Sequence, residues 1–283
     1  MIARASKWKV LPACLLGLAL TAPAIAQETQ IAETNPLSYA DIADMISVAP
    51  VVAVAKTGRA KRLKGDLAVN LTPGYARYLV EAKLSALLRG DQGMPARITY
   101  LADVPLDPSN RQSKLAKQQV LLALAPVPGR PEFVQLISAR AQIPWSAAQE
   151  TRIRELLREL VAPDAPPRVT GIGNAFHVRG SLPGESETQI FLKTEDGQPI
   201  SLAILRRPGE ETRWAVALGE MVDEAARPPQ PDTLLWYRLA CFLPDALPAS
   251  SVAGLYDSDA IAANIDYRFV IESLGSCRRS PLP

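Results

Sequence analysis

The sequence predicts an α+β protein with a β-rich N-terminal half and a C-terminal half of antiparallel strands and helices. Apolar residues recur with a period of two in short runs between residues 51 and 138. A single amphipathic helix then follows Ser146, and strand and helix patterns share the rest of the chain. With 48% hydrophobic residues, the chain can bury one large core or two of ordinary size.

The first 26 residues have the layout of a secretory signal peptide. Three cations precede an apolar run over residues 11–20, and Ala24-Ile25-Ala26 forms an A-x-A cleavage site. We therefore expect residues 1–26 to be removed after Ala26 and the mature chain to be periplasmic or secreted. Lipidation at Cys14 is the alternative, because Leu11-Pro12-Ala13 before this cysteine resembles a lipoprotein box.

The charge balance argues against nucleic acid as a partner. Loss of Arg4, Lys7 and Lys9 with the leader turns the formal net charge of +2 into −1, so no global electrostatic attraction for a polyanion remains. No second segment approaches the apolar length of a membrane span, and we expect no transmembrane anchor.

Residues 27–144 are predicted to form the β-rich domain. A short helix over residues 36–47 comes before Pro50, which ends it. The segment 126–131 contains three prolines and a glycine and predicts a hairpin. Five strands in succession favour a small β-barrel or sandwich, with strands at 51–59, 75–88, 96–104, 119–125 and 133–138.

The run Leu87-Leu88-Arg89-Gly90 ends a predicted strand and precedes the next. This order over about residues 50 to 140 resembles the OB-like barrels of the netrin-like and metalloprotease-inhibitor type, which implies an OB-like barrel here. Those inhibitors bind catalytic zinc through a cysteine at the mature N-terminus. The mature chain is expected to begin at Gln27 and not at a cysteine. We therefore do not expect inhibition through zinc binding here.

Residues 145–283 are predicted to form the second, α+β domain. Ser146 precedes its first helix and Pro163 ends it. Turns at residues 196–197 and 208–209 join the next strands into a meander. Three strands are expected at 189–193, 200–206 and 214–222, then a helix capped by Asp232 through Leu243 and one capped by Ser258 from 259 to 274.

Cys241 and Cys277 are the two cysteines that remain after the leader. In an oxidising compartment they are expected to form a disulfide that staples the C-terminal helices together. The closed loop of about 37 residues makes such a bridge worth roughly 3 to 4 kcal/mol. No C-x-x-C spacing indicates a redox pair.

His177 is the only histidine, and any Ser-His-Asp chemistry must use it. We expect its segment, residues 171–186, to form an exposed loop. Ser181 and Ser186 are candidate nucleophiles there, and the candidate carboxylates to orient the imidazole are Glu185, Glu187 and Asp223. The serines do not lie in a G-x-S-x-G motif, so a packed, structural histidine is the other interpretation.

Metal and cofactor sites are not expected. One histidine and two oxidised cysteines are a poor donor set for zinc. Asp257-Ser258-Asp259 lacks the later ligands of a calcium loop and fits helix capping better. Gly171-Ile172-Gly173 lacks the third glycine of a dinucleotide site.

Cations gather in one stretch that contains no acidic residue, and they are candidates for binding an anionic envelope component. The alternative interpretation of this stretch is a strand end whose cations only face water. The cations are Lys56, Arg59, Lys61, Arg62 and Lys64. The Trp236-Tyr237 pair is a candidate for stacking on a sugar or a partner protein, with core packing as the alternative.

Two runs, 180–192 and 233–241, carry a resemblance of the whole chain to an uncharacterised family of exported alphaproteobacterial proteins. That resemblance implies export and no activity. We expect a non-catalytic binding or envelope-associated module. A serine hydrolase built on His177 with Ser181 or Ser186 is the alternative, and an inhibitor or assembly factor for another exported protein is a third possibility.

Overall fold

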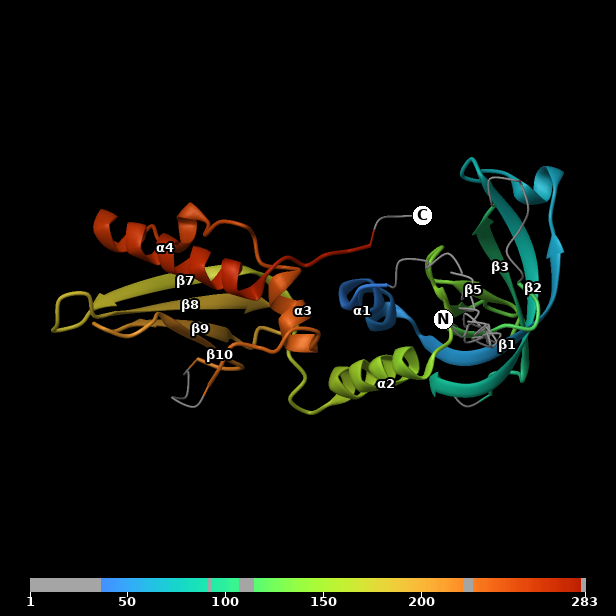
Figure 1. The fold of residues 1–283 in the computed structure, drawn as a ribbon, viewed down its shortest axis with the longest axis horizontal. Coiled ribbons are helices and arrows are strands. Elements are labelled where there is room, and N and C mark those ends of the chain that lie inside the picture. The colour runs from blue at the N-terminus through green and yellow to red at the C-terminus, as the bar shows by residue number, and fades with distance from the viewer. Residues whose placement is uncertain (1–36, 91–92, 107–114, 221–225, 281–283) are drawn as a thin grey trace, which may run out of the picture. The chain divides into compact units, whose positions relative to one another are not determined.

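The computed structural model describes residues 37–280 except 91–92, 107–114 and 221–225, and contains helices and two antiparallel sheets (Figure 1). The predicted signal peptide and Cys14 lie outside these residues. The strands of the first sheet are β1 (Val51–Arg62), β2 (Tyr75–Arg89), β3 (Arg97–Pro105), β4 (Gln119–Pro126), β5 (Val134–Leu136) and β6 (Gln142–Pro144). The second sheet contains β7 (Val169–Arg179), β8 (Ser186–Thr194), β9 (Ile200–Arg206) and β10 (Arg213–Ala217).

The helices lie before, between and after the sheets in sequence. They are α1 (Tyr39–Val48), α2 (Ala147–Val161), α3 (Leu234–Ala240) and α4 (Asp257–Leu274), with short 3-10 turns at Gly65–Ala68 and Ala249–Ser251. Ser146 caps α2 as expected by accepting from the backbone of Gln149. The expected cap at Asp232 is wrong, because the Thr233 hydroxyl caps α3 by accepting from the backbone of Trp236.

The central strands of the first sheet, β1 and β4, are apolar on both faces. Its strand order is β3-β2-β1-β4-β5, with β6 also paired to β4. One face packs on side chains of β2 and β3, and the other packs on α1 and α2. This two-sided burial explains why residues 51–55 and 120–124 are continuous apolar runs.

The expected barrel closure is not found among the described residues. A single parallel bridge joins Thr99 of β3 to Phe133, just before β5, and the Thr99 amide donates to the carbonyl of Glu132. No continuous ladder joins these two edges of the sheet. The observed class is therefore α+β with an open, antiparallel first sheet.

The second sheet has four strands in the order β10-β9-β8-β7, where the sequence predicted three. The missed strand is β7, since residues 171–179 belong to it and do not form the expected loop. Its glycines, Gly171 and Gly173, concealed the alternation that marks a strand. Helix α4 lies along one face of this sheet (Figure 1) and buries Ala263, Tyr267 and Val270 against it.

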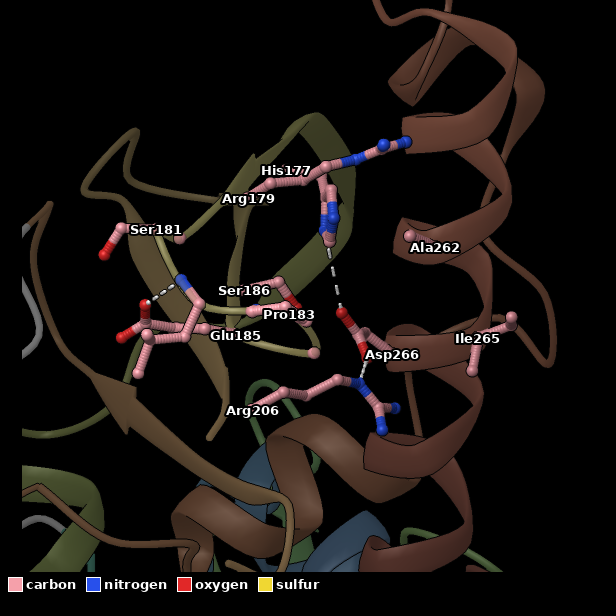
Figure 2. A pocket seen from close by; sticks show the side chains of 13 residues that line it. His177, Arg179, Ser181, Pro183, Glu185, Ser186, Arg206, Ala262, Ile265 and Asp266 are labelled. Carbon is pink, nitrogen blue, oxygen red and sulfur yellow. Dashed lines mark hydrogen bonds and ion pairs between the residues drawn. The ribbon is translucent and has the colours of Figure 1, made fainter. Parts of the chain in front are cut away.

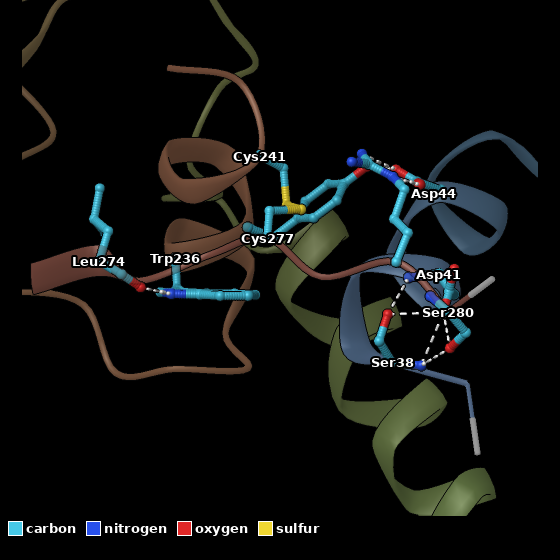
Figure 3. The surroundings of a disulfide bond; sticks show 10 residues. Ser38, Asp41, Asp44, Trp236, Cys241, Leu274, Cys277 and Ser280 are labelled. Atoms are coloured by element: carbon cyan, nitrogen blue, oxygen red, sulfur yellow. Dashed lines mark hydrogen bonds and ion pairs between the residues drawn. A yellow bond between two sulfur atoms is a disulfide. The ribbon is translucent and has the colours of Figure 1, made fainter. Parts of the chain in front are cut away.

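The C-terminal segment after α4 is joined to α3 and α1. Cys277 forms a disulfide with Cys241, the residue that ends α3 (Figure 3). Farther along, the amide and hydroxyl of Ser280 donate to the buried carboxylate of Asp41 in α1. Burial raises the pKa of Asp41, but the hydrogen bonds from Ser280 and Ser38 outweigh burial and hold this pKa below its ordinary value.

Replacing Cys241 and Cys277 together by serine is expected to lower the free energy of unfolding by roughly 3 kcal/mol, because the unfolded chain loses a covalent loop constraint. Urea unfolding with and without a reductant measures this difference. The variant serves as the control, since a reductant must leave its transition unchanged. Identical transitions of the oxidised and reduced wild-type protein would contradict a stabilising disulfide.

Candidate functional site

Four polar side chains from different elements meet between the second sheet and α4. His177 of β7 and Thr188 of β8 are paired in register, so they share the sheet face that α4 covers. Arg206 of β9 lies beside them, and Asp266 of α4 approaches from the helix (Figure 2). The side chains of His177 and Asp266 are only 5% and 1% exposed.

A chain of hydrogen bonds connects this cluster. His177 Nδ1 lies 2.8 Å from Thr188 Oγ1, the Thr188 hydroxyl donates to Asp266 Oδ2, and Arg206 Nε donates to Asp266 Oδ1 at 2.6 Å. Both oxygens of the buried carboxylate therefore have a donor, one of them cationic. This pairing offsets the cost of burying Asp266.

The direction of these bonds assigns the histidine tautomer. A hydroxyl has one hydrogen, and Thr188 gives it to Asp266, so Thr188 must accept from His177 Nδ1–H. In the neutral imidazole, Nε2 is then the unprotonated acceptor. Nε2 has no hydrogen-bond partner among the described residues, so in the neutral ring it is an unpaired acceptor.

His177, Arg206 and Asp266 line a cavity of about 630 Å³ together with the β7–β8 hairpin loop. Ser181 and Ser186 line the same cavity. Ser181 points away from His177 (Figure 2), and among the described residues neither serine hydroxyl forms a hydrogen bond with the imidazole.

Glu185 and Glu187, two of the three carboxylates predicted to orient His177, form no hydrogen bond or ion pair with it. Glu185 accepts from the Leu182 amide within the hairpin loop. Glu187 pairs with Val178, and both lie on the sheet face opposite His177. Asp223 lies outside the described residues. The orienting carboxylate is Asp266 instead, acting through Thr188.

Sequence reasoning missed Asp266, although one signal was present. Asp266 interrupts the apolar face of α4, where Ala263, Tyr267 and Val270 are buried around it. A carboxylate at a buried helix position requires a partner. Thr188 and Arg206 had no comparable signal, because their contacts depend on the register of three strands.

Several hydrogen-bond donors of the hairpin loop already have acceptors within the protein. The amides of Gly180 and Glu185 donate to carbonyls within the loop, and the Leu182 amide donates to the Glu185 carboxylate. Arg179 is also engaged, donating to the Ser258 hydroxyl at 2.7 Å. Among the described residues, the arrangement lacks the hydrogen bond between nucleophile and histidine that acyl transfer requires.

The cations predicted to bind an anion lie on and just after β1 and are all exposed. Strand pairing places two further cations beside them, which the sequence pattern did not indicate. Lys56 pairs with Lys83 of β2, which in turn pairs with Arg97 of β3. We call the basic face the set Lys56, Arg59, Lys61, Lys64, Lys83 and Arg97. Arg62 pairs with the buried Tyr78 and so lies on the other face of β1.

Within the described chain, no side chain of the basic face forms an ion pair with a carboxylate. Lys61 pairs with Leu79 and Leu79 with Leu101, whose side chain is 47% exposed. Val69, 54% exposed, lies nearby because its carbonyl accepts from Arg77 of β2. The basic face thus combines free cations with exposed apolar side chains.

The remaining candidates are structural. Trp236 and Tyr237 are buried, the indole N–H donates to the Leu274 carbonyl at 2.9 Å, and the Tyr237 hydroxyl donates to Asp44 at 2.6 Å. No group of three or more histidine, cysteine, aspartate or glutamate side chains suited to a metal ion occurs among the described residues.

Comparison with known proteins gives no family assignment, since no protein-family model matches the chain. No curated protein matches it either.

Thr188→Val keeps the shape of the side chain but removes the donor to Asp266 and the acceptor for His177. We expect it to lower the free energy of unfolding by about 2 to 3 kcal/mol, because two buried polar groups lose their partner. Urea unfolding gives the value. Thr188→Ser, which keeps the hydroxyl, is the matched control, and equal losses in both variants would show that the hydrogen bonds contribute nothing.

Proposed function

We propose that this chain is an exported, non-catalytic binding module that associates with the anionic surface of a cell-envelope membrane through its basic face. The observation that carries the proposal is the row of Lys56, Lys83 and Arg97 across three adjacent strands, none of which forms an ion pair within the described residues. Each such cation contributes about 1 kcal/mol near an anionic bilayer.

The apolar neighbours of these cations favour a lipid surface over a soluble acidic polymer. Leu101 and Val69 gain by leaving water at a bilayer interface, and neither gains from a hydrated polysaccharide. The formal charge of −1 expected for the mature chain means that the attraction must be local to this face. It therefore orients the protein as well as binding it.

The proposed location draws on two further findings. The Cys241–Cys277 disulfide is typical of an oxidising compartment. In the described part of the chain, no helix has the length and apolarity needed to cross a bilayer. Within this proposal, residues 27–144 form an OB-like domain, supported by the antiparallel strand order and the Thr99–Phe133 bridge, and residues 145–283 form the second domain.

The triple variant Lys56→Gln, Lys83→Gln, Arg97→Gln tests the proposal by removing three cations without adding bulk. We expect about a hundredfold weaker binding to vesicles of phosphatidylglycerol and phosphatidylethanolamine, since three favourable charge contributions are lost. Vesicle co-sedimentation at low and physiological salt measures the change, and wild-type binding must weaken as salt increases.

The matched control removes three exposed cations elsewhere, with Lys193→Gln, Arg207→Gln and Arg268→Gln, and is expected to bind vesicles as the wild type does. Equal losses in both triple variants would show that net charge alone matters and would contradict a specific face. Wild-type binding to heparin with none to anionic vesicles would replace the lipid surface by a soluble polyanion.

The alternative, a hydrolase centred on His177, is favoured by one observation. The Asp266–Thr188–His177 chain places the proton of a neutral imidazole on Nδ1, the tautomer that a general base acting through Nε2 requires, and Ser181 and Ser186 line the same cavity as His177. Against it, no serine of the described chain is hydrogen-bonded to that histidine, and the amides of Gly180, Leu182 and Glu185 already have acceptors within the loop.

A fluorophosphonate probe distinguishes the two functions because it labels only an activated serine. We expect no labelling of the purified protein after prolonged incubation, measured by intact-protein mass spectrometry. A chymotrypsin-type protease in the same solution controls for probe reactivity. Labelling at Ser181 or Ser186 that disappears in His177→Ala would establish the hydrolase instead.

A further inference from the structure

The loop between β1 and β2 carries large apolar side chains in open solvent. It spans residues 63–74 and contains the short 3-10 turn Gly65–Ala68. Leu67 of this turn is 66% exposed, and Val69 just after it is 54% exposed. Exposed apolar side chains that gather in one place, unlike single ones, indicate a contact surface.

The strand register that arranges the basic face also places this loop at its end. Leu101 of β3, itself exposed, pairs with Leu79 of β2. Arg77, two residues earlier on β2, lies on the same face of the sheet. Its Nη1 atom donates to the Val69 carbonyl at 3.3 Å. The apolar loop therefore continues the side of the sheet on which the cations and Leu101 lie.

Hydrogen bonds hold the loop against β2. Arg77 Nε and Nη2 donate to the two carboxylate oxygens of Asp103 at 2.7 and 2.8 Å, which fixes the guanidinium that contacts Val69. Where the loop begins, the Leu63 amide donates to the Arg77 carbonyl at 2.8 Å. A loop whose shape is already fixed loses less conformational entropy when it meets a partner.

The charges around the loop fit the headgroup layer of an anionic bilayer. Lys61 and Lys64 precede the turn and are exposed, so their long side chains can contact phosphates while apolar neighbours lie deeper. Asp66 in the loop and Glu81 on β2 oppose this attraction, but the cations of the basic face outnumber them. Successive side chains of a 3-10 turn point about 120° apart, so Asp66 need not follow Leu67 out of water.

We propose that the β1–β2 loop is an apolar anchor that inserts Leu67 and Val69 below the phosphate headgroups of an anionic bilayer, an inference that rests on the proposed membrane association of the basic face. The cations supply attraction that salt weakens. The anchor supplies burial of apolar area, which salt does not screen. Binding therefore has two components, and the loop accounts for the one that persists in salt.

The polarity-sensitive fluorophore NBD, attached at Leu67→Cys of the purified protein, tests insertion. With vesicles of phosphatidylglycerol and phosphatidylethanolamine, we expect its emission to shift to shorter wavelength and gain intensity as the label leaves water. The matched control is NBD at Leu182→Cys, which replaces a leucine that is 57% exposed in the β7–β8 loop, and its emission should not change.

The outcomes separate the anchor from the function on which it rests. Co-sedimentation of the protein with the vesicles, without a change in emission at position 67, would overturn the anchor and leave the proposed function standing. An equal change at positions 67 and 182 would also overturn the anchor. Failure of the wild type to co-sediment would overturn both proposals.

Leu67→Ser removes the apolar side chain and keeps every cation of the basic face. We expect about tenfold weaker binding to these vesicles, because less apolar area leaves water, with the salt dependence of the wild type retained. Leu182→Ser is the matched control and should bind as the wild type does. Unchanged affinity of Leu67→Ser, or an equal loss in Leu182→Ser, would contradict the anchor.

Discussion

Compensation of buried charge is the constraint on which the rest of this structure depends. Asp266 and Asp41 are both almost completely buried, and each is surrounded by donors from elements distant in sequence. Asp266 joins α4 to β8 and β9, while Asp41 joins α1 to the C-terminal segment and to Arg140. The same bonds that neutralise the carboxylates therefore hold helices in place.

The constraint also separates structural polar groups from functional ones. A buried polar group whose donors and acceptors all have partners within the protein, as Asp41 has, gives no indication of a ligand site. Several described groups depart from that state, among them the Nε2 atom of His177, the guanidinium of Arg238 and the cations of the basic face. Only the last lies on open surface with enough charge to attract a large partner, which is why envelope association is the function that we favour.

Sequence patterns predicted most elements because their signals are local. The strands at 51–62 and 119–126 and the helix after Ser146 follow from apolar runs and a cap. Strand β7 was missed because glycines interrupt its alternation, and the cap at Asp232 was misplaced by one residue. Of the site, His177 and the β1 cations were found from the sequence, but Asp266, Lys83 and Arg97 join them only through helix packing and strand register.

The central claim is that the basic face itself meets an anionic membrane. A nitroxide label at Leu101→Cys on that face, compared with one at Lys193→Cys on β8, tests it by electron paramagnetic resonance with an aqueous collision reagent. The account predicts that anionic vesicles shield the label at position 101 and leave the label at 193 accessible. Equal shielding of both labels, or shielding of 193 alone, would contradict it.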